Sequence, residues 1–354
     1  MDRARSGLLA AATLLLFGFG SVVPASAAEA ERSALGRYPE RVYVPNAAGN
    51  TLHVIDPKTF EIVKTHTVGL YPHHVTPSWD LTKLYVTNTG QNSLTVIDPM
   101  TGEIEREIRV PDPYNLYFTP DGKMAIVVAE RHKRLDFRDP RTWKLIKSVH
   151  VEWPGVDHLA FSRDGSYLVA SCEWGGRIVK VDLKKLELVA DMALGKNPID
   201  VLRPPRQNLM FIADQGVNGV FVVDPDAWKQ LEFIPAGRGT HGLLLSHDEK
   251  KIYASNRYEG SITVIDIATR QVITKWKTGG TPDMGQLSPD GTQLWISSRY
   301  PIMGRANSDV RVIDTRTGKV IATIPTDRES HGLTYFPNSR GTRSLGHNGV
   351  YQLD

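Results

Sequence analysis

Histidines recur at one position of a repeated pattern, directly before a run of apolar residues. His241 precedes the run "GLLL", and His73 and His331 stand at the matching position of two other copies. Asp283 takes this position in a further copy. Imidazole nitrogens and carboxylate oxygens are protein ligands that suit zinc and copper ions. We therefore predict that His73, His241, His331 and Asp283 form a transition-metal site.

A second group of polar residues is expected close to these four. They include one histidine from the same kind of position and residues that follow a neighbouring apolar run. The group comprises Arg131, Arg257, Arg299, Glu130, Glu173 and His158. Histidines, carboxylates and arginines gathered in one place predict contacts with a small, metal-containing cofactor, for which a haem-like group is an alternative to a bare ion.

The metal prediction depends on position and not on a linear motif. The chain has no H-E-x-x-H, no tandem C-x-x-C and no His-x-His sequence. A single histidine before such a run can also serve packing and turn hydrogen bonds. The one cysteine, Cys172, is a reactive thiol, a metal ligand or a small packed residue, and the last is the usual role of a lone cysteine.

An internal repeat determines where these residues lie. The fragment "SLTVIDPMTGEIEREIRV" recurs in seven versions, for example as "SITVIDIATRQVITKWKT". The copies share an aspartate, found at Asp56, Asp98, Asp139, Asp182, Asp224, Asp266 and Asp314. These aspartates are separated by 42, 41, 43, 42, 42 and 48 residues. A period of this length is typical of one four-stranded blade of a β-propeller.

Each copy contains four short strands, which we call A to D from the propeller axis outwards. In one copy they read "GLLLSHD", "KIYASN", "SITVID" and "QVITKW". A sheet this small cannot bury both of its faces alone, whereas seven sheets packed around an axis can. The predicted fold is all-β, a single seven-bladed β-propeller with four-stranded blades.

The two ends of the repeat region predict how the ring closes. The chain starts with a B-like strand at Arg41–Asn46 and ends with an unpaired A-like strand at His331–Asn338. We expect the last strand to complete the first blade. Strand A begins and strand B ends on the same face of the disc, so the candidate site residues should surround the mouth of the central channel.

The letters "LYVTN" and "SLTVIDPMTGE", with "TPDG" and "SPDG" turns, resemble the YVTN-repeat β-propeller family over roughly residues 40 to 340. The family is in turn distantly similar to the propeller domain of haem-containing nitrite reductases and to methanethiol-oxidase-like copper propellers. This resemblance implies copper or a haem-like cofactor at the mouth, but relatives on one fold do different chemistry.

The amino terminus predicts export. Two arginines precede an apolar core that ends in small residues near Ala27, which is typical of a cleaved secretory signal at residues 1–27. We expect an N-terminal segment at 28–40, the propeller at 41–342 and a tail at 343–354 across one face. The mature chain should lie outside the cytoplasm, in the periplasm or medium, without a membrane span.

Composition gives little indication of a macromolecular partner. The chain is 41% hydrophobic and 23% charged, and its net charge is only +3, which does not favour nucleic acid or an acidic membrane. Three functions stay open: a non-catalytic protein that binds a metal or a small metal-containing ligand, an oxidoreductase with copper or a haem-like cofactor, and a scaffold that binds another exported protein.

Overall fold

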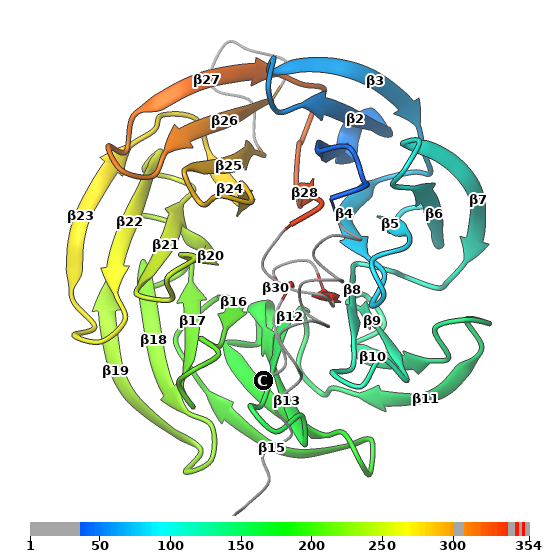
Figure 1. Cartoon of the computed structure of the whole chain (residues 1–354). Helices are drawn as coiled ribbons and strands as arrows, with labels where there is room; N and C mark the ends of the chain where they lie inside the picture. Colours follow the sequence, from blue (N-terminus) through cyan, green and yellow to red (C-terminus); the bar gives the residue numbers. More distant parts are fainter. Residues whose placement is uncertain (1–35, 300–307, 339–343, 347–348, 351–354) are drawn as a thin grey trace, which may run out of the picture.

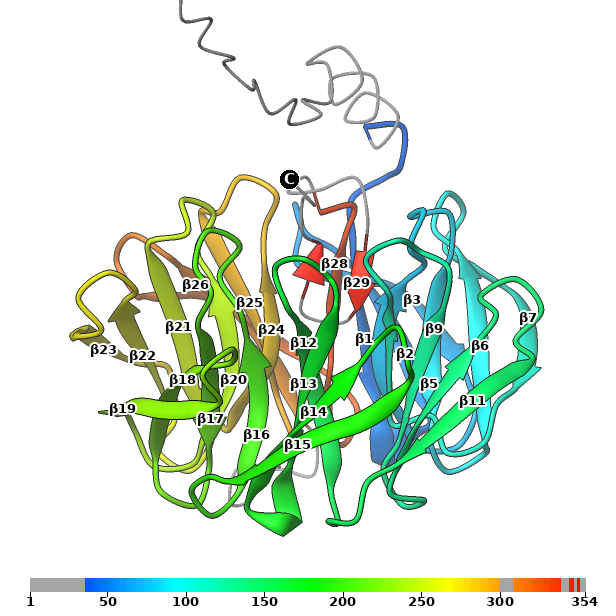
Figure 2. The ribbon, with the colours of Figure 1, turned by 90° about the horizontal axis from the view of Figure 1, so that it is seen from below.

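The computed structural model describes residues 36–299, 308–338, 344–346 and 349–350. The predicted signal peptide at 1–27 and most of the predicted tail lie outside the described residues. Figures 1 and 2 show the described chain as a ring of small twisted sheets whose strands run between the two faces of a disc. None of the helices in the described ranges is long and apolar enough to cross a bilayer.

The ring contains seven antiparallel blades, each built on four strands, which confirms the predicted fold. The innermost strands are β28 (Thr334–Phe336), β4 (Pro72–Pro77), β8 (Asn115–Phe118), β12 (Val156–Phe161), β16 (Pro198–Leu202), β20 (Thr240–Leu245) and β24 (Pro282–Leu287). The second strands are β1 (Arg41–Asn46), β5 (Leu84–Asn88), β9 (Ala125–Ala129), β13 (Tyr167–Cys172), β17 (Met210–Asp214), β21 (Lys251–Asn256) and β25 (Gln293–Ser298).

The outer half of each blade follows the same order. The third strands are β2 (Thr51–Asp56), β6 (Ser93–Asp98), β10 (Arg134–Arg138), β14 (Arg177–Asp182), β18 (Gly219–Asp224), β22 (Ser261–Asp266) and β26 (Asp309–Asp314). The outermost strands are β3 (Glu61–Thr67), β7 (Glu103–Arg109), β11 (Leu145–His150), β15 (Glu187–Ala193), β19 (Lys229–Pro235), β23 (Val272–Lys277) and β27 (Val320–Pro325). The 3-10 turns η1 (Ala47–Gly49) and η2 (Glu173–Gly175) follow β1 and β13.

The repeated aspartates hold the turns between the third and outermost strands. Asp56 Oδ1 accepts a hydrogen bond from the backbone N–H of Lys58 at 2.8 Å, and Asp98 Oδ1 accepts one from Met100 at 2.7 Å. The other five repeated aspartates make the same kind of bond. An aspartate that bonds its own backbone a few residues ahead stabilises a tight turn, which is why the repeat needs this residue type.

The hydrophobic core lies between blades and not within them. The described residues form seven clusters of buried side chains, and each draws its residues from two neighbouring blades. One cluster joins Val42 and Val44 of the first blade to Trp295 and Val310 of the seventh. Burial of both faces of each sheet therefore requires the complete ring, as expected for this architecture.

Ring closure occurs where the sequence predicted it. Strand β28 pairs antiparallel with β1, with Arg41 opposite Phe336 and Tyr43 opposite Thr334. The first blade thus contains strands from both ends of the chain, ordered β28-β1-β2-β3. The paired strand is shorter than the predicted His331–Asn338 segment, and a separate bridge joins Asn46 to Ser330.

Two pieces of the C-terminal tail add to the third blade. Strand β29 (Ser344–Gly346) pairs with β8 through Gly346 and Tyr117, and β30 (Gly349–Val350) pairs with β29. Figure 1 shows them inside the ring, beside the innermost strands. The predicted course of residues 343–354 across one face stays a prediction, because the rest of the tail lies outside the described residues.

Deletion of residues 331–354 should destabilise the ring, because it removes β28 together with the buried side chains of Leu333, Tyr335 and Phe336. We expect the melting temperature to fall by at least about 10 °C and the protein to aggregate, since the inner edge of β1 is then unpaired. A matched deletion of residues 339–354 keeps β28 and should cost far less. Equal melting temperatures for the two truncated proteins would contradict this account of closure.

Candidate functional site

Near their first residues, most of the innermost strands depart from regular pairing with the second strand of the blade. In five blades the register of the innermost strand with the second strand shifts across two residues, as between Pro72 and Val75 of β4. The same shift occurs in β12, β16, β20 and β24. A β-bulge of this kind breaks strict alternation and re-aims side chains. The skipped pairs are His73 and His74, Asp157 and His158, Ile199 and Asp200, His241 and Gly242, and Asp283 and Met284.

Hydroxyl groups on the second strands satisfy the backbone that these bulges leave unpaired. Thr87 Oγ1 accepts the N–H of His74 at 2.9 Å. Ser255 Oγ accepts the N–H of Gly242 at 2.8 Å and donates to the carbonyl of Asp283 in the next blade at 2.7 Å. One hydroxyl therefore stabilises the bulge of its own blade and, in this case, also links that blade to its neighbour.

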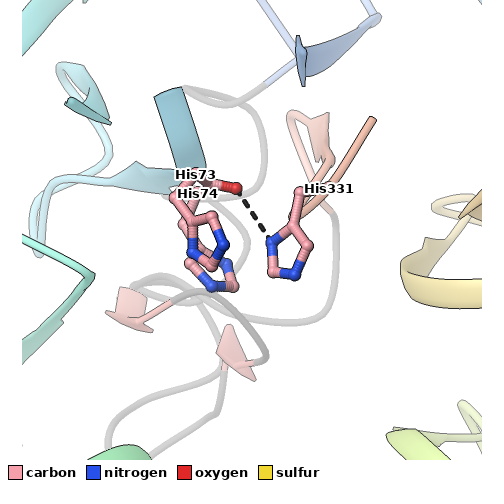
Figure 3. Close-up of side chains that lie close together, drawn as sticks. All are labelled: His73, His74 and His331. Carbon is pink, nitrogen blue, oxygen red and sulfur yellow. Dashed lines mark hydrogen bonds between the residues drawn. The ribbon is translucent and has the colours of Figure 1, made fainter. Parts of the chain in front are cut away.

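Three buried histidines converge inside the ring (Figure 3). One ligand nitrogen from each of His73, His74 and His331 lies within 4.8 Å of the other two. The rings of His73 and His331 are stacked with centroids 3.9 Å apart, and the ring of His74 meets both edge-on at 4.9 and 4.8 Å. We refer to these residues as the histidine triad.

Backbone hydrogen bonds between the first and second blades bring the triad together. The N–H of Gly332 donates to the carbonyl of His73 at 3.0 Å, and the N–H of Val75 donates to the carbonyl of Gly332 at 3.0 Å. These bonds align His331 with the bulge of β4, so two consecutive histidines of one strand and one histidine of the neighbouring blade share a small space.

The hydrogen bonds of His331 determine which of its nitrogens can bind a metal. Its Nδ1 lies 3.1 Å from the carbonyl oxygen of His73, and because a carbonyl only accepts, Nδ1 carries the proton (Figure 3). The lone pair is then on Nε2, which Arg299 Nη1 contacts at 3.1 Å. Burial, together with the charges of His73 and Arg299, lowers the pKa of His331 well below its ordinary value, so the ring is neutral.

His241 lies beside the triad but in a different set of contacts. Its Nδ1 is 3.2 Å from Asp283 Oδ1, and its Nε2 contacts the guanidinium of Arg257. Arg257 Nε donates to the same Asp283 oxygen at 3.0 Å. The ring of His241 is 6.4 Å from that of His331, whose Nε2 lies 3.2 Å from Asp283 Oδ2. Burial lowers the pKa of His241 well below its ordinary value, and Arg257 adds to the shift.

Of the four predicted metal ligands, the structure brings His73 and His331 into the triad and places Asp283 next to it. His241 touches the triad through Asp283. His74 was absent from the predicted ligand set. Adjacent residues of a regular strand point to opposite faces, and only the bulge between Pro72 and Val75 allows both histidines to meet His331. The adjacent pair "HH" before an apolar run is the one signal that could have indicated it.

His158, predicted among the cofactor contacts, extends the cluster toward the third and fourth blades. Its ring is edge-on to His74 with centroids 5.3 Å apart. Its Nε2 lies 3.3 Å from Asp157 Oδ1, and its Nδ1 lies 3.1 Å from the hydroxyl of Tyr117. His158 is completely buried and packs against His74, and its contact with a cofactor stays a prediction.

The three predicted arginines have different partners. Arg299 contacts His331, and Arg257 contacts His241 and Asp283. Arg131 instead donates to Asp112 Oδ1 and to the carbonyl of Thr89, both at 2.6 Å. Two of the three arginines therefore touch the candidate site, while Arg131 fixes loops of the second and third blades.

Carboxyl groups of the third and fourth blades have raised pKa values. Burial raises the pKa of Glu173 to about 7, with Arg257 opposing the shift and Glu130 adding to it. Burial also raises the pKa of Glu130, although the indole N–H of Trp174 donates to it at 3.0 Å. The pKa of Asp157 lies well above its ordinary range because of burial and the charges of Glu173 and Glu130. These groups therefore retain protons to higher pH than ordinary carboxyl groups do.

Replacing Glu173 by Gln should change stability in a pH-dependent way. The folded state retains the Glu173 proton up to about pH 7, whereas the unfolded chain releases it near its ordinary pKa, so this residue costs stability as pH rises through that interval. We expect Glu173→Gln to be neutral at pH 5 and to stabilise by about 1–3 kcal/mol at pH 8, measured by urea unfolding. The same effect at both pH values would contradict the raised pKa.

Replacing Thr87 by Val should destabilise the fold, because it leaves the buried N–H of His74 without its acceptor. We expect a loss of about 1–3 kcal/mol in the free energy of unfolding. The control is Thr65→Val on the exposed face of β3, which should change stability by less than about 0.5 kcal/mol. Similar losses for both variants would argue against a special role of this hydroxyl at the bulge.

Solved structures with the same fold differ widely in sequence from this chain. "Kuenenia stuttgartiensis Hydrazine Synthase" has a TM-score of 0.62 and 19% identity, covering 73% of this chain and 87% of that one. The dihydro-heme d1 dehydrogenase NirN, in complex with DHE, has a TM-score of 0.66 and 15% identity, covering 85% of this chain and 76% of that one. At such identities the likeness shows the fold alone.

A third structure, a functionally unknown protein from Desulfotomaculum acetoxidans DSM 771, has a TM-score of 0.70 and 15% identity, covering 83% of this chain and 98% of that one. No curated protein matches the chain. A family profile described as "YNCE-like beta-propeller" matches residues 4–339, nearly the whole sequence. The chain therefore belongs to the YNCE-like β-propeller family.

Proposed function

We propose that this propeller binds a divalent transition-metal ion, zinc or copper, at His73, His74 and His331. The observation that carries the proposal is the convergence of three buried imidazoles with ligand nitrogens within 4.8 Å of one another. Nitrogen ligands of a tetrahedral zinc ion lie about 3.4 Å apart at the usual bond lengths. Binding therefore requires the three ring nitrogens to move closer together.

The chemistry of His331 fits a metal ligand. A histidine that binds a metal through one nitrogen usually donates its other N–H to a carbonyl or carboxylate. His331 donates Nδ1–H to the carbonyl of His73 and so presents the Nε2 lone pair. Its lowered pKa keeps the ring neutral, so no proton has to leave before an ion binds.

Asp283 supplies negative charge beside the proposed ion. Its Oδ2 lies 3.2 Å from His331 Nε2, while its Oδ1 is bound by Arg257 and faces His241. This carboxylate offsets part of the charge of a divalent ion and holds His241 in place. Arg257 and His241 thus act on the ion through Asp283, as positioning residues.

The proposed role is binding, at a triad that is almost completely screened from solvent. The sequence adds the proposal that the mature protein acts outside the cytoplasm, where it holds an ion or a small metal-containing ligand and can meet another exported protein. An oxidoreductase with copper or a haem-like cofactor at the same histidines is the alternative, and a scaffold without a ligand is the third possibility.

Metal analysis and absorption spectroscopy of the purified protein separate these alternatives. A haem-like cofactor gives intense bands in the visible region, and copper gives a paramagnetic signal. Zinc gives neither and is detected by elemental analysis at one ion per chain. Absence of any ion, combined with no binding of added zinc or copper, would leave the scaffold.

Replacing His74 by Ala should weaken zinc binding by more than about 100-fold, because it removes one of three ligands. Replacing His241 by Ala should weaken binding by no more than about tenfold, since the ring nitrogens of His241 contact Asp283 and Arg257. Isothermal calorimetry with zinc on the wild type and both variants measures this contrast.

The reverse result, with loss in His241→Ala and retention in His74→Ala, would support the ligand set expected from the sequence. Equal affinity in the wild type and in the His73, His74, His331 triple alanine variant would refute the metal site. Melting temperatures of all variants serve as the control for folding.

A further inference from the structure

We propose that the metal-loaded site also takes a small oxyanion, held between the ion and Arg299. This inference rests on the proposed function, because it assigns a ligand to the same site. It comes from the contacts of one guanidinium group with the triad, and it names the chemical class of the ligand as a carboxylate or an inorganic oxyanion.

Arg299 follows the last residue of β25 and lies directly at the lone pair that an ion must use. Its Nη1 contacts His331 Nε2 at 3.1 Å. Its Nη2 donates to the hydroxyl of Tyr71 at 3.3 Å, and the ring of Tyr71 is stacked on that of His73 with centroids 5.8 Å apart. Arg299 is thus held against two members of the triad, directly and through Tyr71.

An ion at His331 Nε2 changes what Arg299 can do. The nitrogen lone pair cannot accept from Arg299 and bind a metal at the same time, so the guanidinium loses this acceptor when the ion arrives. Two positive groups then lie within a few ångströms in a poorly hydrated place, where their repulsion is strong. An anion that binds the ion and accepts from the guanidinium removes the repulsion.

The carboxylates around the triad do not neutralise the proposed ion and its neighbouring arginines, so an external anion can bind between the ion and Arg299. Asp283 is the carboxylate next to His331, and Arg257 already binds it through a buried ion pair. The carboxyl groups of Glu130, Glu173 and Asp157 belong to the third and fourth blades, and their raised pKa values reduce their charge. A divalent ion with Arg257 and Arg299 carries four positive charges, which exceed the two negative charges of Asp283 and of Glu329, the carboxylate that Arg299 reaches through Tyr71.

The geometry favours an oxyanion over a halide. A guanidinium is a planar fork that binds two oxygens of a carboxylate or phosphate at once. Tyr71, whose hydroxyl accepts from Arg299, is 37% exposed, so one neighbour of the guanidinium reaches the solvent. The hydroxyl of Tyr71 donates to Glu329 at 3.2 Å, which orients it to accept from Arg299.

The test uses full-length protein loaded with cobalt(II), whose visible spectrum reports its ligands. Titration with sodium acetate and, separately, with inorganic phosphate should change the spectrum of the wild type in a saturable way. The anion that binds more tightly distinguishes a carboxylate ligand from a tetrahedral one. Arg299→Gln should retain cobalt but bind the anion about 10–100-fold more weakly.

Arg131→Gln is the matched control. Arg131 lies two residues after the second strand β9 and carries the same charge, but it is fixed to Asp112 and Thr89. Its replacement should leave both cobalt and anion binding unchanged. Arg299→Lys, which keeps the charge without the fork, should give an intermediate anion affinity and replaces Arg299→Gln if that variant does not fold.

Anion affinity that is equal in the wild type and in Arg299→Gln would overturn the role of Arg299. A wild-type cobalt spectrum that neither anion changes would overturn the anion site and leave the metal site standing. If the wild type does not bind cobalt or zinc at all, the proposed function itself fails, and this inference fails with it.

Discussion

The candidate site depends on the two-residue interruption of pairing at the start of the innermost strands. A regular strand would show the channel only every second side chain, but the interruption in β4 presents His73 and His74 together. The interruption removes a backbone N–H and carbonyl from the ladder, and such groups are costly to bury without partners. The hydroxyls of Thr87, Ser171 and Ser255 act as these partners, because each accepts a hydrogen bond from a backbone N–H of the interrupted segment. The chemistry of one strand is thus made possible by a small residue of the next.

Around the mouth of the channel, each group of neighbouring blades reduces its buried charge in a different way. On the side of the first and second blades the triad is present, and the pKa of His331 is lowered so that the ring stays neutral. On the side of the sixth and seventh blades, the positive charge of Arg257 is matched by Asp283. On the side of the third and fourth blades, carboxyl groups such as Glu173 hold protons to higher pH. Burial forces each group of blades to lower its net charge, and each does so by different chemistry.

The sequence was sufficient to predict the fold because the features that define each repeat are short-range patterns of residue types. The aspartate of each turn, the alternating apolar residues and the unmatched strands at Arg41 and His331 predicted the blades, their number and their closure. These features depend on neighbours along the chain, or on completing a ring with a known number of blades. Export and the course of the tail fall on residues outside the described part of the structure, and they stay predictions.

The candidate site could be predicted only in part. Position in the repeat indicated that His73, His331 and Asp283 share the mouth, since the repeat fixes where each strand starts. It could not show that His74 joins them, because that depends on a bulge. Nor could it show that His241 pairs with Asp283 and Arg257, because the choice among nearby partners is decided by side-chain distances of about 3 Å. Composition and spacing contain no such distances.

The place of the triad on the ring has a consequence for how the molecule comes apart. His331 lies just before the strand that closes the first blade, and it is 258 residues away from His73. Unfolding can begin by opening this seam, and the chain has a single cysteine, so no internal disulfide holds the seam shut. An ion shared by the two histidines would act as a cross-link over nearly the whole propeller. By binding only the closed ring, it would slow the first step of unfolding and join the two ends of the chain without a covalent bond.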